Sequence, residues 1–135
     1  MVRRAAILIG LGAVAALVLA APAAAAPAWL VPTNLSAPGR DATEPQIAVD
    51  AAGNTAAVWA RTNGSHTIIQ STSRPAGGSW TPVFDLSAAG RNATEPQVAI
   101  EPGGRAVAVW SRSNGAHTVI QGASKPAGEI GRAHV

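Results

Sequence analysis

The sequence predicts an all-β fold built from two tandem copies of a four-stranded antiparallel sheet, and three observations lead to that prediction. The chain is a repeat with an offset of 51 residues: Ala42–Val49, ATEPQIAV, returns as Ala93–Ile100, ATEPQVAI. Residues 29–77 and 80–128 align without an insertion and are identical at 27 of 49 positions. Glycine, proline or Asn-Gly interrupts the chain roughly every ten residues, as between short strands. A period of this length indicates a repeat architecture.

The first 26 residues have the order of a secretory signal peptide. Arg3 and Arg4 precede an uncharged apolar run, residues 5–21, and small residues follow. We expect this segment to be the one long helix of the chain and to be cleaved near Ala25 or Ala26. A membrane anchor is the alternative, but about 17 apolar residues are at the short limit for a span. The mature protein is therefore expected to be secreted or extracytoplasmic, with only transient membrane contact through this segment.

The last seven residues, Glu129–Val135, break the repeat. Gly-Gly-Ser-Trp is expected after Pro126-Ala127, but the chain reads Gly-Glu-Ile-Gly. The tail also matches the translation of a common sequencing adapter, so we interpret it as an assembly artefact. A natural C-terminus is the alternative. The repeat domain is then residues 27–128.

Composition narrows the function. Without residues 1–26 and 129–135, seven Lys+Arg stand against six Asp+Glu, so the formal charge falls from +3 to about +1. No basic patch for nucleic acid remains. The chain has no cysteine, which excludes disulfide staples and thiolate metal sites. No phosphate loop, nucleophile elbow or zinc spacing is present, and no cofactor is expected.

Apolar runs and turn residues alternate within each repeat and place the strands. Asn63-Gly64 supplies the positive-φ residues of a tight hairpin. In the first repeat, strands are expected at residues 46–50, 55–61, 66–73 and 80–86. In the second, they are expected at residues 97–101, 106–112 and 117–124.

The second strand of each repeat is apolar at successive positions, in Ala56–Trp59 and Ala106–Trp110. Both faces of these strands must then be covered, as in stacked sheets. Four antiparallel strands in about 50 residues correspond to one blade of a β-propeller. The predicted fold is therefore an incomplete β-propeller of about two blades. Two blades leave two apolar faces open, so we expect residues 27–128 alone to aggregate or exchange strands.

The repeat domain begins with a lone fourth strand, because Trp29–Leu35 aligns with Trp80–Leu86. The second blade, in contrast, lacks its fourth strand. An open edge is a template for any compatible strand. We expect Trp29–Leu35 either to pair with the edge at residues 117–124 or to lie, poorly ordered, against the first blade.

Ser73–Trp80, SRPAGGSW, resembles the Asp-box of sialidase-like propellers, Ser-x-Asp-x-Gly-x-Thr-Trp, a hairpin between the third and fourth strands of a blade. Pro75 stands where the family has its Asp, so the hydrogen bonds of that Asp are missing. Across Trp29–Gly128, the wider pattern of Glu-Pro-Gln, Ala-Val-Trp and Gln is similar to repeats of secreted bacterial sialidase-like proteins. The resemblance implies further blades in the parent chain.

Three functions are compatible with this resemblance: a module that binds a carbohydrate or another surface ligand, part of a sialidase-type glycoside hydrolase, or a protein-interaction scaffold of the cell envelope. A retaining sialidase needs a Tyr nucleophile and a cluster of three arginines. The chain has no Tyr, and its arginines form repeat-equivalent pairs such as Arg61 and Arg112. We therefore predict a binding module with no catalytic residue in this portion.

The candidate ligand-binding residues are Arg40, Glu44, Arg91 and Glu95. Residues that recur in every blade are more often scaffold, forming ion pairs between blades or capping loop backbone. The alternative is that the glutamates, at the start of the innermost strands, form a carboxylate ring that binds cations or sugar hydroxyls. His66 and His117 follow the Asn-Gly turns; we expect them to be solvated or packed at an edge, and we expect no metal site.

Overall fold

The computed structural model describes residues 10–126, and the chain divides into two units, Met1–Val31 and Pro32–Val135. The predictions for the N-terminal arginine pair and for the seven-residue tail concern residues outside the described range.

The described residues of the first unit do not form the expected signal-peptide helix. Residues 10–31 are exposed and form neither helix nor strand; the side chain of Leu17, for example, is 83% exposed. An isolated helix of this length gains little in water without a packing partner, and Gly12 and Pro22 disfavour it further. Within the described residues no helix is long and apolar enough to cross a membrane. Export stays a prediction.

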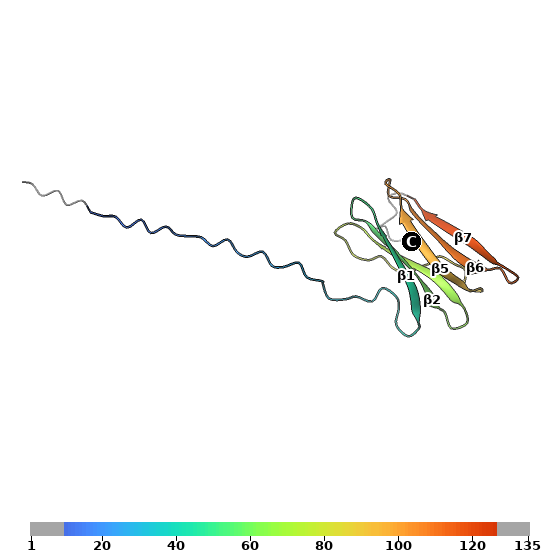
Figure 1. Ribbon diagram of the computed structural model, residues 1–135. Helices are drawn as coiled ribbons and strands as arrows, with labels where there is room; N and C mark the ends of the chain where they lie inside the picture. The colour runs from blue at the N-terminus through green and yellow to red at the C-terminus, as the bar shows by residue number, and fades with distance from the viewer. Residues whose placement is uncertain (1–9, 127–135) are drawn as a thin grey trace, which may run out of the picture. The chain divides into compact units, whose positions relative to one another are not determined.

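The second unit is all-β, as predicted. Its described part consists of two antiparallel sheets that lie side by side in Figure 1, with strand orders β1-β2-β3-β4 and β5-β6-β7. The strands are β1 (Ala42–Val49), β2 (Thr55–Thr62), β3 (Thr67–Arg74), β4 (Phe84–Asp85), β5 (Ala93–Ile100), β6 (Ala106–Ser113) and β7 (Thr118–Lys125). Within each sheet, every strand pairs with its neighbour in sequence. We call β1–β4 the first sheet and β5–β7 the second.

The bounds of β2, β3, β6 and β7 confirm the predicted strands to within one residue. The turn between β2 and β3 is the expected Asn-Gly hairpin: the Asn63 N–H donates to the His66 carbonyl (2.8 Å), and Gly64 has φ 106°. The same turn recurs at Asn114, whose N–H donates to the His117 carbonyl (2.9 Å).

The first strand of each repeat was predicted too short. β1 starts at Ala42 rather than Gln46, because a β-bulge carries the pairing past Glu44 and Pro45. Thr43 pairs with Ala60 and Gln46 with Val58, so two residues of β1 lie opposite one residue of β2. β5 contains the same bulge. Proline has no N–H to donate to a ladder, and the bulge removes the need for one.

The fourth strand was predicted too long, since β4 covers only Phe84–Asp85 of residues 80–86. The Thr81 N–H still donates to the Ser73 carbonyl (2.7 Å), and the Leu86 N–H donates to the Ile69 carbonyl (2.7 Å). Between these two contacts stands Pro82, which lacks an N–H. The segment therefore follows β3 without forming a continuous ladder.

The lone segment Trp29–Leu35 forms no strand, and it does not pair with β7. Trp29 is fully exposed. Within the second unit, Leu35 is half-buried, and Thr33–Ser36 line a shallow hollow against β1 and β2. The expected pairing with the open edge is thus wrong for this structure, and the part of the segment in the second unit lies against the first sheet.

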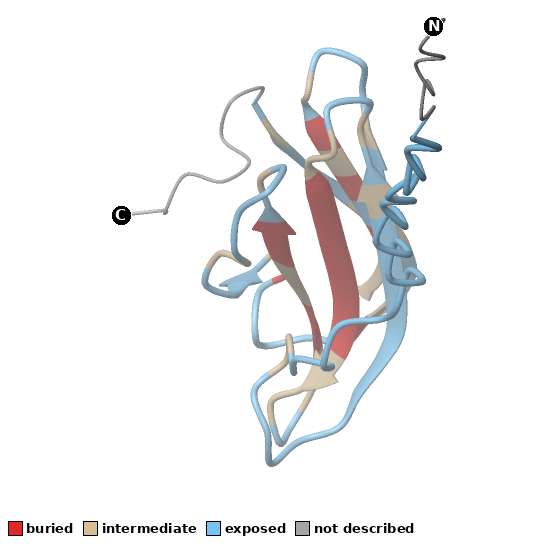
Figure 2. Cartoon of the chain, turned by 90° about the vertical axis from the view of Figure 1, so that its left-hand side faces the viewer, coloured by how far each residue is buried: buried red, intermediate tan, exposed pale blue. Residues whose placement is uncertain are grey.

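The core lies between the two sheets, where β5 contacts β1, β2 and β3. It is formed by Val58, Ala60 and Ile69 of the first sheet and by Ala93, Ala108 and Trp110 of the second. Figure 2 shows β2 buried along most of its length. Residues Thr55–Ala60 are all buried, so both faces of β2 are covered, whereas β6 alternates between buried and more exposed positions.

Candidate functional site

The two candidate glutamates occupy equivalent bulges and have left-handed backbone conformations, with φ 54° at Glu44 and φ 56° at Glu95. A non-glycine residue in this region costs about 1–2 kcal/mol, so the surrounding contacts must hold it. One such contact joins the sheets: Oε2 of Glu44 accepts a hydrogen bond from the Glu95 N–H (2.6 Å). The structure thus brings the two glutamates together.

The carboxylate of Glu95 bonds within its own sheet, where its Oε2 accepts from Oγ of Ser111 (3.0 Å). Both glutamates are exposed. Each carboxylate therefore has one oxygen in a scaffold contact, and the pair forms a short acidic ridge at the bulges, which we call the glutamate ridge. Its geometry serves sheet-to-sheet attachment directly, because one side chain holds the backbone of the next repeat.

The candidate arginines do not join the glutamate ridge. Arg40 packs over the turn at Gly64, where a Cβ would lie 2.9 Å from its Cζ, and Arg91 packs over Gly115 in the same way (2.8 Å). A side chain at either glycine would force the guanidinium to move, in addition to the strain of a positive φ. Across residues 10–126 the ion pair within 4 Å is Arg105–Glu101. Arg40 and Arg91 are thus turn-packing residues in this structure.

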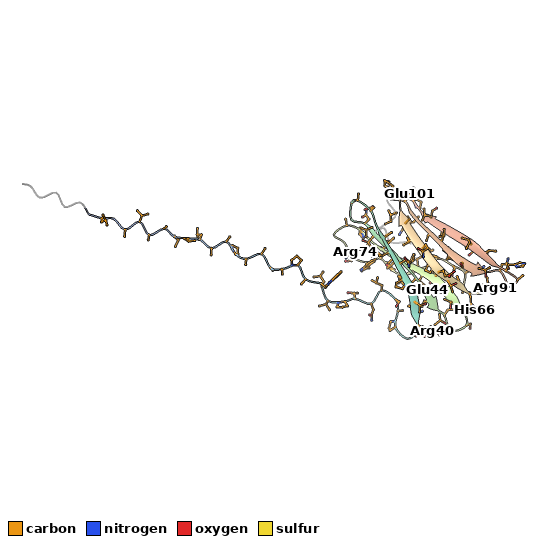
Figure 3. All side chains as sticks on the ribbon, viewed as in Figure 1. Arg40, Glu44, His66, Arg74, Arg91 and Glu101 are labelled. Carbon is orange, nitrogen blue, oxygen red and sulfur yellow. The ribbon has the colours of Figure 1, made fainter. Side chains whose placement is uncertain are left out.

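The two candidate arginines lie at the same end of the strands as His66 (Figure 3). In Figure 3, Arg40, His66 and Arg91 lie at that end, whereas Arg74 and Glu101 lie at the other. The histidines follow the Asn-Gly turns: the His66 N–H donates to Oδ1 of Asn63 (2.9 Å). Within the described residues no group of three His, Cys, Asp or Glu side chains is placed to hold a metal.

Arg61 acts on loop backbone, since its Nη2 donates to the Ala37 carbonyl (3.1 Å). Its Nε is buried without a partner, and so is Nε of the equivalent Arg112. The guanidinium of Arg61 lies on the face that carries Ala57 and Trp59. This geometry matches the role of a loop cap that was expected for residues recurring in both repeats.

A cleft between the two sheets was not predicted from the sequence. It has a volume of about 280 Å³, and its walls are mainly apolar. Phe84, Leu86 and Val58 contribute from the first sheet, and Val98, Val107 and Ala123 from the second. No single repeat contains this cleft, because its two walls come from different repeats, so no sequence motif marks it.

Hydroxyl groups and one cation border the cleft. Nζ of Lys125 bridges the sheets by donating to Oγ of Ser73 (3.2 Å). Oγ1 of Thr72 donates to the Thr81 carbonyl (2.6 Å), and the Ser73 N–H donates to Oγ1 of Thr81 (3.1 Å). The run Ser71-Thr72-Ser73 in β3 is the sequence feature that would have pointed to a polar border here.

The hairpin that resembles an Asp-box connects β3 to the fourth segment. Its turn is closed by the Gly78 N–H, which donates to the Pro75 carbonyl (2.9 Å), and Oδ1 of Asn54 accepts from the Ala76 N–H (3.0 Å). The Arg74 guanidinium lies over the Trp80 ring, 5.3 Å from its centroid. Asn54, from the neighbouring turn, thus holds the hairpin from outside.

Comparisons with known proteins do not assign a family. No protein-family model matches the chain, and no curated protein matches it.

Proposed function

We propose that the chain is part of an exported, β-propeller-type repeat protein that binds a carbohydrate or another small surface ligand. The observation that carries this proposal is the cleft of about 280 Å³ between the sheets, with its apolar walls and hydroxyl border. Ligand sites are typically concave, mostly apolar and equipped with a few polar groups that orient the ligand. The cleft volume of about 280 Å³ is just below the roughly 300–1,000 Å³ of typical ligand pockets, which suits a single sugar ring.

The chemistry of the cleft fits the two kinds of surface on a sugar. Phe84 is 50% exposed and offers a ring against which the apolar face of a sugar can pack. Ser71, Ser124 and Lys125 lie on the same lining and offer hydroxyl and ammonium groups to sugar oxygens. The glutamate ridge is a separate, acidic surface that could accept hydrogen bonds from sugar hydroxyls, on the exposed oxygens of Glu44 and Glu95.

A pair of matched variants tests the cleft as the site. Ala123→Leu adds bulk to a residue on the cleft wall, whereas Ala99→Leu makes the same change at an exposed position of β5 outside the lining. Binding of neutral and acidic monosaccharides is measured by saturation-transfer NMR. We expect the native chain and Ala99→Leu to bind alike and Ala123→Leu to bind at least roughly tenfold more weakly, a loss of about 1.4 kcal/mol.

The ridge gives the contrasting result. If Glu44→Gln and Glu95→Gln weaken sugar binding while Ala123→Leu does not, the site lies on the glutamate ridge instead of in the cleft. If no sugar binds the native chain at millimolar concentration, the carbohydrate proposal is wrong.

A further inference from the structure

The two sheets stack head to tail. The face of the first sheet that enters the core carries Val58 and Ile69, but the face of the second sheet that enters it carries Ala108 and Trp110. These are not equivalent faces, because the repeat partners of Val58 and Ile69 are Val109 and Ile120, on the other side of the second sheet. Each sheet therefore has one face that fits its successor and one that fits its predecessor.

Both outer faces carry apolar side chains equivalent to those that are buried between the sheets. Val109 is 40% exposed and Ile120 is 72% exposed, whereas their partners Val58 and Ile69 are exposed by only 2% and 0%. We call the side of the second sheet that bears Val109 and Ile120 the tail face.

The opposite surface lies on the first sheet. Ile47 and Val49, paired with Ala57 and Thr55, are 63% and 60% exposed. Their repeat partner positions in β5 are half-buried against the first sheet. We call the side bearing Ile47 and Val49 the head face. The tail face is thus equivalent to the surface through which the first sheet contacts the second. The head face is equivalent to the surface of the second sheet in that same contact.

The polar contacts between the sheets also have their partners on the outer faces. The Thr67 N–H donates to Oδ1 of Asn92 (2.9 Å); the equivalent residues are Thr118 and Asp41, which again offer an N–H and a carboxylate oxygen. Lys125 bonds Ser73 across the sheets, and the equivalents of these two residues are Arg74 and Ser124. In each case, one outer face carries the hydrogen-bond donor and the other carries the acceptor.

We propose that a second copy of this chain docks its tail face on the head face of the first copy and repeats the contact that joins the two sheets. This interface is independent of ligand binding. Such a contact is heterologous, so copies add until a ring closes or a filament grows. A ring of 4–8 sheets, as in propellers, would hold about two to four copies.

The segment Thr33–Ser36 also has an equivalent in the contact between the two sheets. It is equivalent to residues 84–87, which pair with β3, and Ser87 Oγ accepts from the Ile69 N–H (2.8 Å). Thr33–Ser36 lies on the head face, against Ala57 and Trp59. A tail face docked there brings β7, the equivalent of β3, beside this segment, and Ser36 then takes the place of Ser87 toward Ile120.

The test uses the full chain and single charged substitutions at exposed positions. Ile120→Asp blocks the tail face, Ile47→Lys blocks the head face, and Leu17→Lys removes a similar side chain, 83% exposed, from the first unit. Native mass spectrometry measures the assembly, and circular dichroism checks that the strands are retained. We expect the native chain and Leu17→Lys to form the same oligomer, and each face variant to fall to the monomer of 13.5 kDa.

Mixing distinguishes head-to-tail docking from other association. When the two variants are mixed in equal amounts, Ile47→Lys supplies an intact tail face and Ile120→Asp supplies an intact head face. The mixture should therefore form a one-to-one dimer and nothing larger. The proposal is overturned if the native chain is monomeric at tens of micromolar. It is also overturned if Leu17→Lys dissociates the oligomer, or if only one of the two face variants dissociates it. A mixture that stays monomeric overturns it as well.

Discussion

The two repeats have nearly the same residues and different environments. Ile69 of β3 is fully buried, but Ile120, at the same place in β7, is 72% exposed. Nothing in the local sequence separates them: both follow the Asn-Gly turn by the same distance and face the same way in their sheets. Burial here is set by the position of a sheet in the stack, because within residues 10–126 the first sheet packs against a following sheet and the second does not.

The second strands make the same comparison. Both read as apolar at successive positions, yet both faces are covered only in β2. In β2 one face meets the second sheet, and the other lies beneath Thr33–Ser36. The apolar face of β6 that carries Val109 has no cover among the described residues, and a further sheet of the same kind is what the repeat would place there.

The largest expected difference is between Ile69→Ala and Ile120→Ala, both made in the monomeric Ile47→Lys background. Ile69→Ala should lower the free energy of unfolding by about 2–5 kcal/mol, because it opens a cavity in the core. Ile120→Ala should change it by less than about 0.5 kcal/mol, since its side chain is already largely in water. Urea denaturation followed by tryptophan fluorescence measures both.

The same pair in the native background sharpens the comparison. If copies dock head to tail, Ile120→Ala should also lower stability there, and more so as the protein concentration rises. Equal effects of the two substitutions in the monomeric background would contradict the burial difference between the repeats.

The next difference concerns the two buried tryptophans. Nε1 of Trp59 donates to Oε1 of Gln70 (3.2 Å), whereas Nε1 of Trp110 is buried without a partner. Both rings are at most 5% exposed, so Phe removes a similar volume at either site. Trp59→Phe should therefore destabilise more than Trp110→Phe, by about 1 kcal/mol for the lost hydrogen bond.

Differential scanning calorimetry of the two variants checks this order. Gln70→Ala should reproduce part of the loss, and Gln121→Ala, the equivalent change beside Trp110, serves as the matched control. A larger loss in Trp110→Phe than in Trp59→Phe would show that its indole N–H has a partner in solution.

The sequence was sufficient for the strands whose pattern is local. The apolar runs and Asn-Gly turns placed β2, β3, β6 and β7 to within a residue. The predicted strand bounds were wrong around prolines. Glu44-Pro45 was interpreted as the end of a loop, but a β-bulge lets the ladder continue past these residues. The same reasoning overextended the fourth strand across Pro82. In both cases the outcome depended on the pairing partner, which the segment itself does not contain.

The candidate site divides in the same way. Glu44 and Glu95 were expected either to bind a ligand or to form ion pairs between blades or caps of loop backbone; the structure shows a hydrogen bond from the Glu95 N–H to Oε2 of Glu44 between the sheets. Arg40 and Arg91 were named as candidates because they too recur in both repeats, and the structure places them over their own turns. The cleft lies between repeats, so the sequence of either repeat alone could not predict it.

The smallest expected difference is at the turns that follow β1 and β5, where Asp50 and Glu101 are equivalent residues. The side-chain hydrogen bond from Asn54 lowers the pKa of Asp50 from its ordinary value, and the side-chain hydrogen bond and charge of Arg105 lower the pKa of Glu101. Arg105 holds both carboxylate oxygens, through Nη2 (2.6 Å) and Nε (3.0 Å). One turn thus rests on a neutral donor and the other on an ion pair.

Both carboxyl groups have a lower pKa folded than unfolded, so each turn contributes stability above its unfolded pKa, near 4, and loses it as the pH falls through the folded value. NMR titration of the carboxyl carbons should therefore place both midpoints below their ordinary values. In 1 M salt, where the Debye length is about 3 Å, the pKa of Glu101 should rise toward its ordinary value while that of Asp50 moves less, because Asn54 carries no charge. Arg105→Gln should abolish this salt response at Glu101 and leave Asp50 unchanged. A salt response that is equal at the two turns would mean that Arg105 acts through its hydrogen bonds alone, and the distinction between the two repeats at this position would then disappear.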